Sequence, residues 1–314
     1  MKPRLLVRSR FVVVFAIYGF LAAGLFPQQS PWPFLPQPGL SSQPATASSI
    51  TVAFWNIQWF PGNRPDATAA EEKRQITAVQ ADIARLNADV IGMEEVRDFA
   101  HAGVAIQPLR GFKVDVCANF PPREGQDVAQ EVAIASRLQP LSAWAEEWKA
   151  NGALIPPRGF AFAAYQIAPQ QLLMVYAVHL KSNRGEIREN VSMRQESIRQ
   201  LQSHIKAMQA IYGKLGTITW MVGGDFNTSL DDKQFASETT LRSMIDKGFG
   251  WIWQNIPAAS RTTLPPGGDF PAACFDHIFY RGATLRRASV ASTSPQSSDH
   301  HAIVATFDLP AAAK

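Results

Sequence analysis

The chain has 314 residues, of which 46% are hydrophobic and 18% are charged. This composition supplies enough apolar side chains for a large core, and it excludes the highly charged, disordered class of protein. The formal net charge is +4, but residues 1–49 contain four basic residues and no acidic one. The rest of the chain then has 26 basic and 26 acidic residues, so its net charge gives no support for nucleic-acid binding.

Residues 1–26 have the pattern of an export signal. Four basic residues precede an uncharged, apolar run at 11–26. A helix of that length rises about 24 Å, which is less than the roughly 30 Å hydrocarbon core of a bilayer. We therefore predict a signal peptide, with small residues for cleavage at 22–24, and an exported (periplasmic or extracellular) protein. An uncleaved anchor that keeps the protein on the membrane is the alternative.

The next segment, residues 27–49, is rich in Pro, Ser and Gln, which is typical of a flexible linker. From 50 to 311 the sequence has no linker-like change of composition and no repeat, so we predict one domain there. The two cysteines, Cys117 and Cys274, have two interpretations. They form a disulfide in an oxidising compartment, or they are small buried hydrophobic residues.

Strands and helices are expected to alternate along this domain. Helices are indicated where apolar residues recur at steps of three and four, at 76–86 and 198–208. Apolar, β-branched and aromatic runs predict strands at 50–56, 89–93, 112–118, 130–136, 160–167, 170–180, 217–224, 275–280 and 301–309. Because many of these runs are apolar on both faces, we predict an α/β fold of four layers. In it, two mixed β-sheets pack face to face and helices flank them.

Polar residues stand at the ends of these strands in a repeated pattern. Each one alone has an ordinary interpretation as a turn residue, a strand-entry residue or a hydrogen-bonded core histidine. Together they resemble the functional groups that collect on loops at one edge of a rigid sheet. The set consists of Asn56, Glu95, His179, Asp225, Asn227, Asp276, Asp299 and His300.

This mixture of carboxylates, amides and imidazoles suits a hard cation with oxygen ligands. Mg²⁺ typically uses one or two carboxylates together with water and substrate phosphate, and Mn²⁺ and Ca²⁺ are alternatives. The sequence has no HExxH motif and no Cys-His cluster, which argues against a zinc site. It also lacks the GxxxxGK[ST] motif of P-loop proteins and the GxSxG motif of serine hydrolases.

The chain from about 50 to 309 resembles the endonuclease/exonuclease/phosphatase superfamily, and within it a secreted bacterial-type branch similar to pancreatic deoxyribonuclease. The superfamily also includes abasic-site endonucleases, sphingomyelinases and inositol-polyphosphate phosphatases. The resemblance is carried, in the family's order, by FWNIQW, VIGMEEV, EVAIASR, VHLKS followed by MRQESIRQL, GGDFN, FDHIFY and SDHHAIV. These pieces cover nearly the whole predicted domain, and the set is far more specific than any single piece.

The resemblance implies a metal site and a phosphate site. Glu95 would be the principal metal ligand, and Asn56 and Asp299 would complete or support that site. Asp225 and Asn227 would lie against the scissile phosphate and the attacking water.

The resemblance also implies roles for the imidazoles. His300 would be the catalytic imidazole, with Asp276 holding its other ring nitrogen, and His179 would donate to the phosphate. A carboxylate beside an imidazole fixes its tautomer and raises its basicity. Whether Asp225 or His300 activates the water stays open at this point.

Several residues depart from the pattern of particular branches. Gln58 stands where abasic-site endonucleases have Asp, and His179 stands where they have Tyr, which argues against abasic-site repair. Glu94 replaces a Gln that is usual in the family, and we interpret it as a neighbour of the metal ligand and not as a ligand itself. His277 and His301 are additional histidines, which we predict to be half-exposed strand residues.

We therefore predict a secreted, Mg²⁺-dependent and monomeric phosphodiesterase that acts on DNA or RNA. The alternative is a sphingomyelinase or another phospholipid or phosphomonoester hydrolase of the same fold. An enzyme that acts on lipid needs an exposed apolar surface, and Trp251 and Trp253 are either such a surface or part of the core. A binding module without activity would require a missing ligand or histidine, and none is missing.

Overall fold

The computed structural model describes residues 48–121, 130–267 and 271–311. The predicted signal peptide and nearly all of the predicted linker lie outside these residues, so both stay predictions. Among the described helices, none is long and apolar enough to span a membrane.

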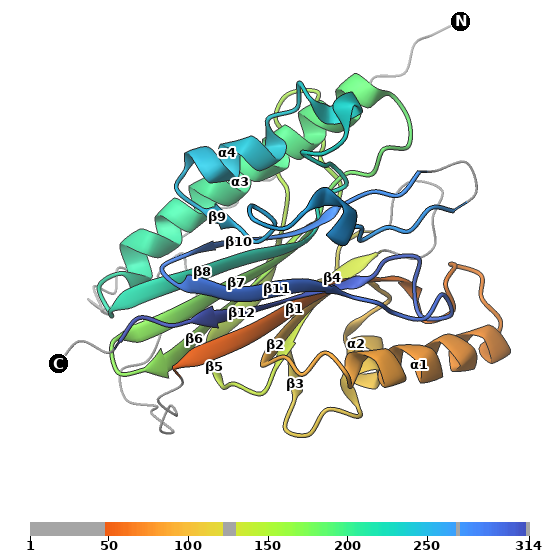
Figure 1. Cartoon of the computed structure of the whole chain (residues 1–314), viewed down its shortest axis with the longest axis horizontal. Helices are drawn as coiled ribbons and strands as arrows, with labels where there is room; N and C mark the ends of the chain where they lie inside the picture. Colours follow the sequence, from red (N-terminus) through yellow and green to blue (C-terminus); the bar gives the residue numbers. More distant parts are fainter. Residues whose placement is uncertain (1–47, 122–129, 268–270, 312–314) are drawn as a thin grey trace, which may run out of the picture. The chain divides into compact units, whose positions relative to one another are not determined.

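In the described part of the chain, twelve strands form two six-stranded sheets (Figure 1). The first sheet has the order β11, β12, β1, β2, β4 and β3, with the bounds Thr284–Ala291, Ala302–Asp308, Ser49–Phe60, Val90–Val96, Glu131–Ser136 and Lys113–Cys117. The second has the order β5, β6, β7, β8, β10 and β9, with the bounds Pro140–Glu147, Gly159–Ala168, Gln171–His179, Thr217–Asp225, Asp276–Arg281 and Gly250–Trp251. Each sheet is mixed, because β1–β2 and β7–β8 pair in parallel and the other pairs are antiparallel.

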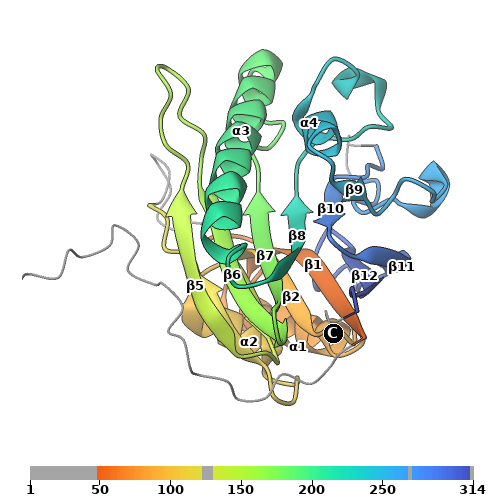
Figure 2. The same ribbon diagram turned by 90° about the vertical axis from the view of Figure 1, so that its left-hand side faces the viewer.

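Helices cover the outer face of each sheet, so the predicted four-layer sandwich is confirmed (Figure 1). The helices α1 and α2 lie on the first sheet, and α3 and α4 lie on the second. Their bounds are Ala69–Ile83, Phe99–Ile106, Ile187–Tyr212 and Thr240–Asp246. Figure 2 shows α3 running along the second sheet, where His204 contacts Phe162 of β6 and Tyr176 of β7.

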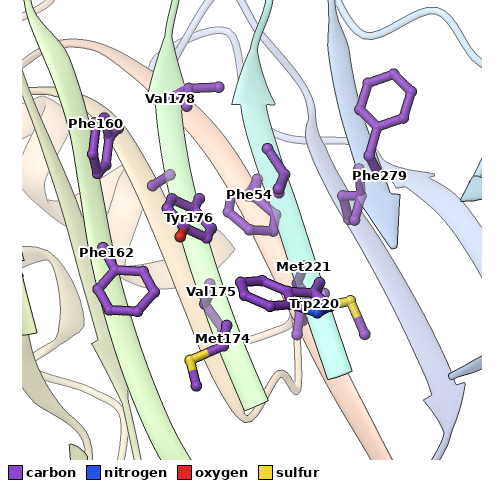
Figure 3. Packing of buried hydrophobic residues seen from close by; sticks show 14 of the residues in the cluster. Phe54, Phe160, Phe162, Met174, Val175, Tyr176, Val178, Trp220, Met221 and Phe279 are labelled. Carbon is purple, nitrogen blue, oxygen red and sulfur yellow. The ribbon is translucent and has the colours of Figure 1, made fainter. Parts of the chain in front are cut away.

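Phe54 of β1 lies between the two sheets, and glycines on both sides make room for its ring (Figure 3). A Cβ atom added to Gly92 of β2 would lie 2.3 Å from the ring, and one added to Gly223 of β8 would lie 2.4 Å from it. Both distances are shorter than carbon atoms tolerate. The first glycine of GGDFN is therefore explained by close packing and not by a turn.

Gly223→Ala is expected to lower the free energy of unfolding by about 1–3 kcal/mol, because the added methyl group overpacks the core at Phe54. Gly103→Ala is the matched control, since nothing lies within 4 Å of the added Cβ in α2. There the substitution is expected to raise stability by roughly 0.5–1 kcal/mol through helix propensity. Urea unfolding measures both variants, and equal midpoints would contradict the packing argument.

The structure decides between the two interpretations of the tryptophans and of the cysteines. Trp251 and Trp253 are 7% and 0% exposed and belong to the core, so an apolar membrane surface built from them is wrong. Cys117 and Cys274 are free thiols, which rules out the disulfide in this structure. Cys274 is buried in the core as a small hydrophobic residue.

Candidate active site

Three of the predicted residues are direct neighbours at one edge of the second sheet. His179 ends β7 and Asp225 ends β8, and the parallel register pairs the two residues. Asp276 begins β10 and is paired with Asp225 from the other side. The sheet therefore places an imidazole and two carboxylates side by side on adjacent strands.

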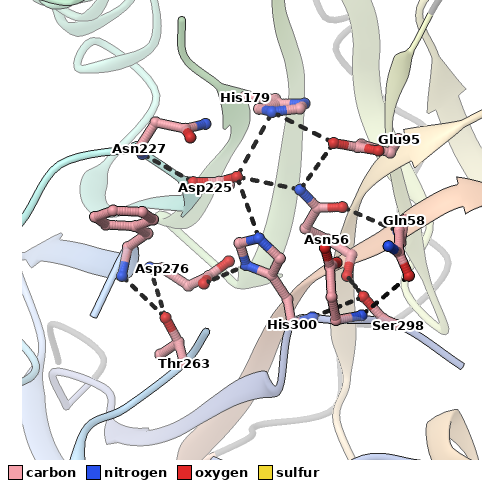
Figure 4. A network of polar contacts seen from close by, with 12 residues as sticks. Asn56, Gln58, Glu95, His179, Asp225, Asn227, Thr263, Asp276, Ser298 and His300 are labelled. Atoms are coloured by element: carbon pink, nitrogen blue, oxygen red, sulfur yellow. Dashed lines mark hydrogen bonds and ion pairs between the residues drawn. The ribbon is translucent and has the colours of Figure 1, made fainter. Parts of the chain in front are cut away.

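Asp225 is the centre of the polar network, and its side chain is almost completely buried (Figure 4). Its Oδ2 accepts a hydrogen bond of 3.1 Å from Asn56 Nδ2. The Nε2 atoms of His179 and His300 approach the same oxygen to 3.5 Å and 3.8 Å. Burial raises the pKa of Asp225 to about 7, with a further contribution from the charge of Asp276, while His300 opposes the shift.

The Asp276 carboxylate holds the His300 ring, the contact that the family resemblance implied. Its Nδ1 lies 2.8 Å from Asp276 Oδ2, which leaves Nε2 directed toward Asp225. Burial alone would lower the pKa of His300, but the charges of Asp276 and Asp225 and the bond to Asp276 raise it well above the ordinary value. The two carboxylates thus favour the protonated ring, in which both nitrogens are donors.

Glu95 lies on the first sheet and faces this group from the end of β2. Its Oε1 accepts from Asn56 Nδ2 at 3.2 Å and lies 3.8 Å from His179 Nε2, and its Oε2 accepts from the Trp59 backbone N–H at 3.0 Å. The backbone of Glu95 is left-handed, with φ of 63°. The side chain is thus aimed from a strained position into the space between the two sheets.

Asn56 connects the two carboxylates through its amide. Its Oδ1 accepts from the backbone N–H of Gln58. This bond orients the amide so that its NH₂ group donates to both Glu95 and Asp225. Gln58 also reaches the loop before β12, because its Oε1 accepts from the backbone N–H of Asp299. Asp299 itself is exposed at the rim of the site.

The donor set of Glu95 and Asp299 fits a divalent cation. Burial raises the pKa of the Glu95 carboxyl, and the negative charge of Asp299 raises it further. A bound cation would remove this unfavourable interaction, and both side chains offer the oxygen donors that Mg²⁺ prefers. The described residues contain no preassembled group of three His, Cys, Asp or Glu ligands, so water and substrate oxygens would complete the coordination.

Asn227 lies beside Asp225 with its side chain tied to the protein. Its backbone N–H donates to Asp225 Oδ1 at 2.8 Å, and its Nδ2 donates to the Leu180 carbonyl at 3.2 Å. Its φ of 53° is left-handed. Asn227 therefore orients one oxygen of Asp225 and joins the loops that follow β7 and β8.

Two groups that contact or adjoin the site were not identified as such from the sequence. Arg158 precedes β6 and donates from Nε to the His179 carbonyl at 2.9 Å and from Nη2 to the Leu180 carbonyl at 2.5 Å. Glu94 is completely buried, and neither of its carboxylate oxygens has a hydrogen-bond partner among the described residues. Burial and then the charges of Asp276 and Asp225 raise the pKa of Glu94 well above its ordinary value.

His277 was predicted to be a half-exposed strand residue, and this is wrong. Its side chain is 0% exposed and connects β9 to the loop after β8. Nδ1 accepts from Trp251 Nε1 at 3.1 Å, so Nε2 carries the proton and donates to the Thr228 carbonyl at 2.9 Å. His301, by contrast, is half-exposed as predicted and contacts Thr293.

The buried His277 gives a pH prediction. Burial lowers its pKa from 6.5 to about 4, so the unfolded chain binds more protons between these values and stability is lost as the pH falls through this window. The loss attributable to this residue is about 3 kcal/mol at the acidic end. Urea unfolding of the wild type and of His277→Gln at pH 7 and pH 4 measures this loss of stability. Gln keeps one hydrogen-bond acceptor and one donor but does not titrate. An equal loss in both proteins would contradict the assignment.

Residues 53–300 match the Endonuclease/Exonuclease/phosphatase family. The chain belongs to this family. Its members hydrolyse phosphoric esters, so the protein is a phosphoric ester hydrolase, as the sequence motifs predicted. Among curated proteins, none matches the sequence significantly.

Solved structures of Endonuclease/Exonuclease/phosphatase proteins share the fold. An endonuclease/exonuclease/phosphatase from Beutenbergia cavernae has a TM-score of 0.60 and 18% identity, over 84% of this chain and 72% of that one. D. rerio TDP2 in complex with a single-strand DNA product has a TM-score of 0.60 and 16% identity, over 83% and 99%. A mannosyl-6-phosphatase from Bacteroides thetaiotaomicron has a TM-score of 0.57 and 14% identity, over 82% and 99%.

Proposed function

We propose that the protein is an exported, Mg²⁺-dependent phosphodiesterase that hydrolyses DNA or RNA. The observation that carries this proposal is the convergence of two imidazoles on one carboxylate. His179 and His300 both direct Nε2 toward Asp225 Oδ2, and Glu95 lies beside the same group. A phosphodiester carries negative charge that grows during attack by water, and donors arranged in this way stabilise it.

Glu95 and Asp299 would hold the cation, and Asn56 would support the site by orienting Glu95 through its amide. When bound, the cation would supply positive charge to a phosphate oxygen, which stabilises the transition state. These assignments follow from the donor chemistry described above and from the raised pKa of Glu95.

Asp225 is the better candidate for the base, and His300 for the donor. The pKa of Asp225 is raised to about 7, so this carboxylate accepts a proton from water far more readily than an ordinary Asp. The charges of Asp276 and Asp225 raise the pKa of His300 well above its ordinary value, which favours the protonated ring that a proton donor needs. As the water oxygen bonds to phosphorus, its proton passes to Asp225 Oδ2 and the bond between phosphorus and the leaving oxygen breaks. His300 donates its Nε2 proton to that leaving oxygen, which departs as an alcohol.

The choice of nucleic acid as substrate is supported by the fold neighbour TDP2, which was crystallised with a single-strand DNA product. The phosphomonoester alternative is supported by the mannosyl-6-phosphatase neighbour. The lipid alternative is less well supported. The apolar surface suggested for it does not exist at Trp251 and Trp253, because both side chains are in the core. Export rests on the sequence of residues 1–26 alone.

A substrate panel tests the proposal. The purified protein is incubated with plasmid DNA, single-stranded RNA, sphingomyelin vesicles or mannose 6-phosphate, each with Mg²⁺ and with EDTA. Cleavage of a polynucleotide that EDTA abolishes is the expected result. Release of phosphate from mannose 6-phosphate without cleavage of nucleic acid would replace the proposal by the phosphomonoester alternative. Full activity in EDTA would overturn the metal requirement.

A further inference from the structure

Arg194 of α3 is completely buried and lies behind the candidate active site. Its guanidinium makes four hydrogen bonds to other segments of the chain. Nε and Nη2 donate to the two carboxylate oxygens of Glu238, at 2.8 Å and 2.6 Å. Nη1 donates to the Lys181 carbonyl at 3.0 Å and to Asn183 Oδ1 at 2.9 Å. A planar fork is suited to bind a carboxylate on one side and further acceptors on the other.

The partners of Arg194 lie on the two loops that leave the catalytic strands. Lys181 and Asn183 follow β7, which ends at His179, and Glu238 follows β8, which ends at Asp225. The guanidinium therefore joins both loops to the long helix α3. A helix of 26 residues is a rigid support for loops that carry functional groups.

A short chain of hydrogen bonds leads from Arg194 to the catalytic carboxylate. Asn183, held by Arg194 through Oδ1, donates from Nδ2 to the Asn227 carbonyl at 2.9 Å. Asn227 in turn donates its backbone N–H to Asp225 Oδ1 at 2.8 Å and its side-chain NH₂ to the Leu180 carbonyl at 3.2 Å. The loops after β7 and β8 are thus bonded to each other as well as to α3.

The conformation of Asn227 makes this support necessary. Its φ of 53° lies in the left-handed region, which Asn adopts more readily than most residues with a side chain but which bonds from the surroundings help to maintain. Without the bond from Asn183, the Asn227 peptide is free to relax to an ordinary conformation. A shift of this peptide would take the N–H donor away from Asp225 Oδ1 and leave the carboxylate less firmly oriented.

We propose that Arg194 is a positioning residue for phosphoester hydrolysis, which acts through Asn183 and Asn227 to orient the Asp225 carboxylate. This inference rests on the proposed function of Asp225. Arg194 is buried behind the loops and does not reach the substrate. The competing explanation is that the pair with Glu238 contributes to folding alone.

The test removes the tether without leaving a buried charge unpaired. In the double variant Arg194→Met/Glu238→Leu both charges are replaced by apolar side chains, a change that buried ion pairs often tolerate. The matched control is Glu196→Leu/Arg199→Met. This pair on the same helix has the same two-bond geometry, with distances of 2.7 Å and 2.6 Å. Among the described residues, the Arg199 side chain makes no hydrogen bond to either loop. Arg194→Lys keeps the charge but has one nitrogen in place of the fork.

Two measurements are made on the full-length protein with plasmid DNA as substrate. Loss of orientation at the reacting group is expected to lower kcat about 10²-fold in the Arg194→Met/Glu238→Leu variant, with KM nearly unchanged. Hydrogen exchange of peptides that cover 180–184 and 226–230 is expected to become faster in the same variant. The control is expected to match the wild type in both measurements, and Arg194→Lys is expected to lie between the two.

Wild-type kcat together with wild-type exchange at both loops would overturn the inference. Should the double variant not fold, Arg194→Lys decides, and wild-type values in it would also overturn the inference. Should the wild type hydrolyse no phosphoester, the proposed function fails, and hydrogen exchange alone then tests the tether. Faster exchange at both loops supports it, and unchanged exchange refutes it.

Discussion

His300→Ala is expected to lower kcat for phosphodiester hydrolysis at least about 10²-fold, the scale of a general acid–base or charge-stabilising group. The variant removes an imidazole that Asp276 holds at 2.8 Å and that points Nε2 toward Asp225. His301→Ala is the matched control. His301 is the next residue in the chain, is half-exposed and contacts Thr293, so its activity is expected to stay within about twofold of the wild type.

The pH profile adds a second readout to this prediction. The proposed base must be deprotonated, and the pKa of Asp225 is raised to about 7. A cation at Glu95 lowers this value, so kcat/KM is expected to rise with pH and to level off at or below about pH 7. The proposed donor loses its proton at a pKa well above the ordinary value of His, which produces a fall on the alkaline side. If kcat/KM of the His300→Ala variant still falls on the alkaline side, a group other than His300 causes that fall.

Glu95→Gln is expected to weaken Mg²⁺ binding and to lower kcat at least about 10²-fold, because it removes the charged oxygen donor of the cation. The size of the side chain is kept, and its one amide oxygen remains as an acceptor for either the Asn56 amide or the Trp59 N–H. The variant therefore tests the charge of Glu95 more than its shape.

Titration calorimetry with Mg²⁺ measures the affinity independently of turnover. Glu189→Gln, an exposed substitution in the first turn of α3, is the control and is expected to bind Mg²⁺ like the wild type. Equal Mg²⁺ affinity in Glu95→Gln and in the wild type would remove Glu95 from the metal site. If Glu95→Gln binds Mg²⁺ more weakly but has a normal kcat at saturating Mg²⁺, then Glu95 contributes to Mg²⁺ binding and not to the chemical step.

The central strands could be predicted from the sequence because burial leaves a strong local signal. Every residue of β7 is buried and so is nearly all of β8, which makes both of them continuous apolar runs. The strands β5 and β11 escaped prediction because each forms one edge of a sheet. Their partly exposed faces admit charged and small residues, as in TLRRASVA, and such a segment has the composition of a loop.

The positions of the candidate catalytic residues could also be predicted, because strand ends in one fold converge on one edge. The roles of the supporting residues could not. A single Arg on a helix, such as Arg194, has the pattern of a solvated charge until its partners from other segments are known. His277 is a similar case, since its two hydrogen-bond partners lie 26 and 49 residues away in the sequence. Periodicity describes one element at a time and contains no information on such contacts.

The left-handed residues at this edge have a consequence for protein engineering. Gln58, Trp59, Glu95 and Asn227 all have φ between 45° and 63°. The backbone of a non-glycine residue in this region is strained by of order 1 kcal/mol or more. Substitution of any of the four by Gly is therefore a candidate change for raising the melting temperature. At Glu95 the same change removes the proposed metal ligand, and at Asn227 it removes the side-chain bond to the Leu180 carbonyl that holds the loop beside Asp225. A higher melting temperature and a high turnover number therefore place opposite demands on these two positions. Selection for heat resistance alone would favour a protein that is more stable but less active.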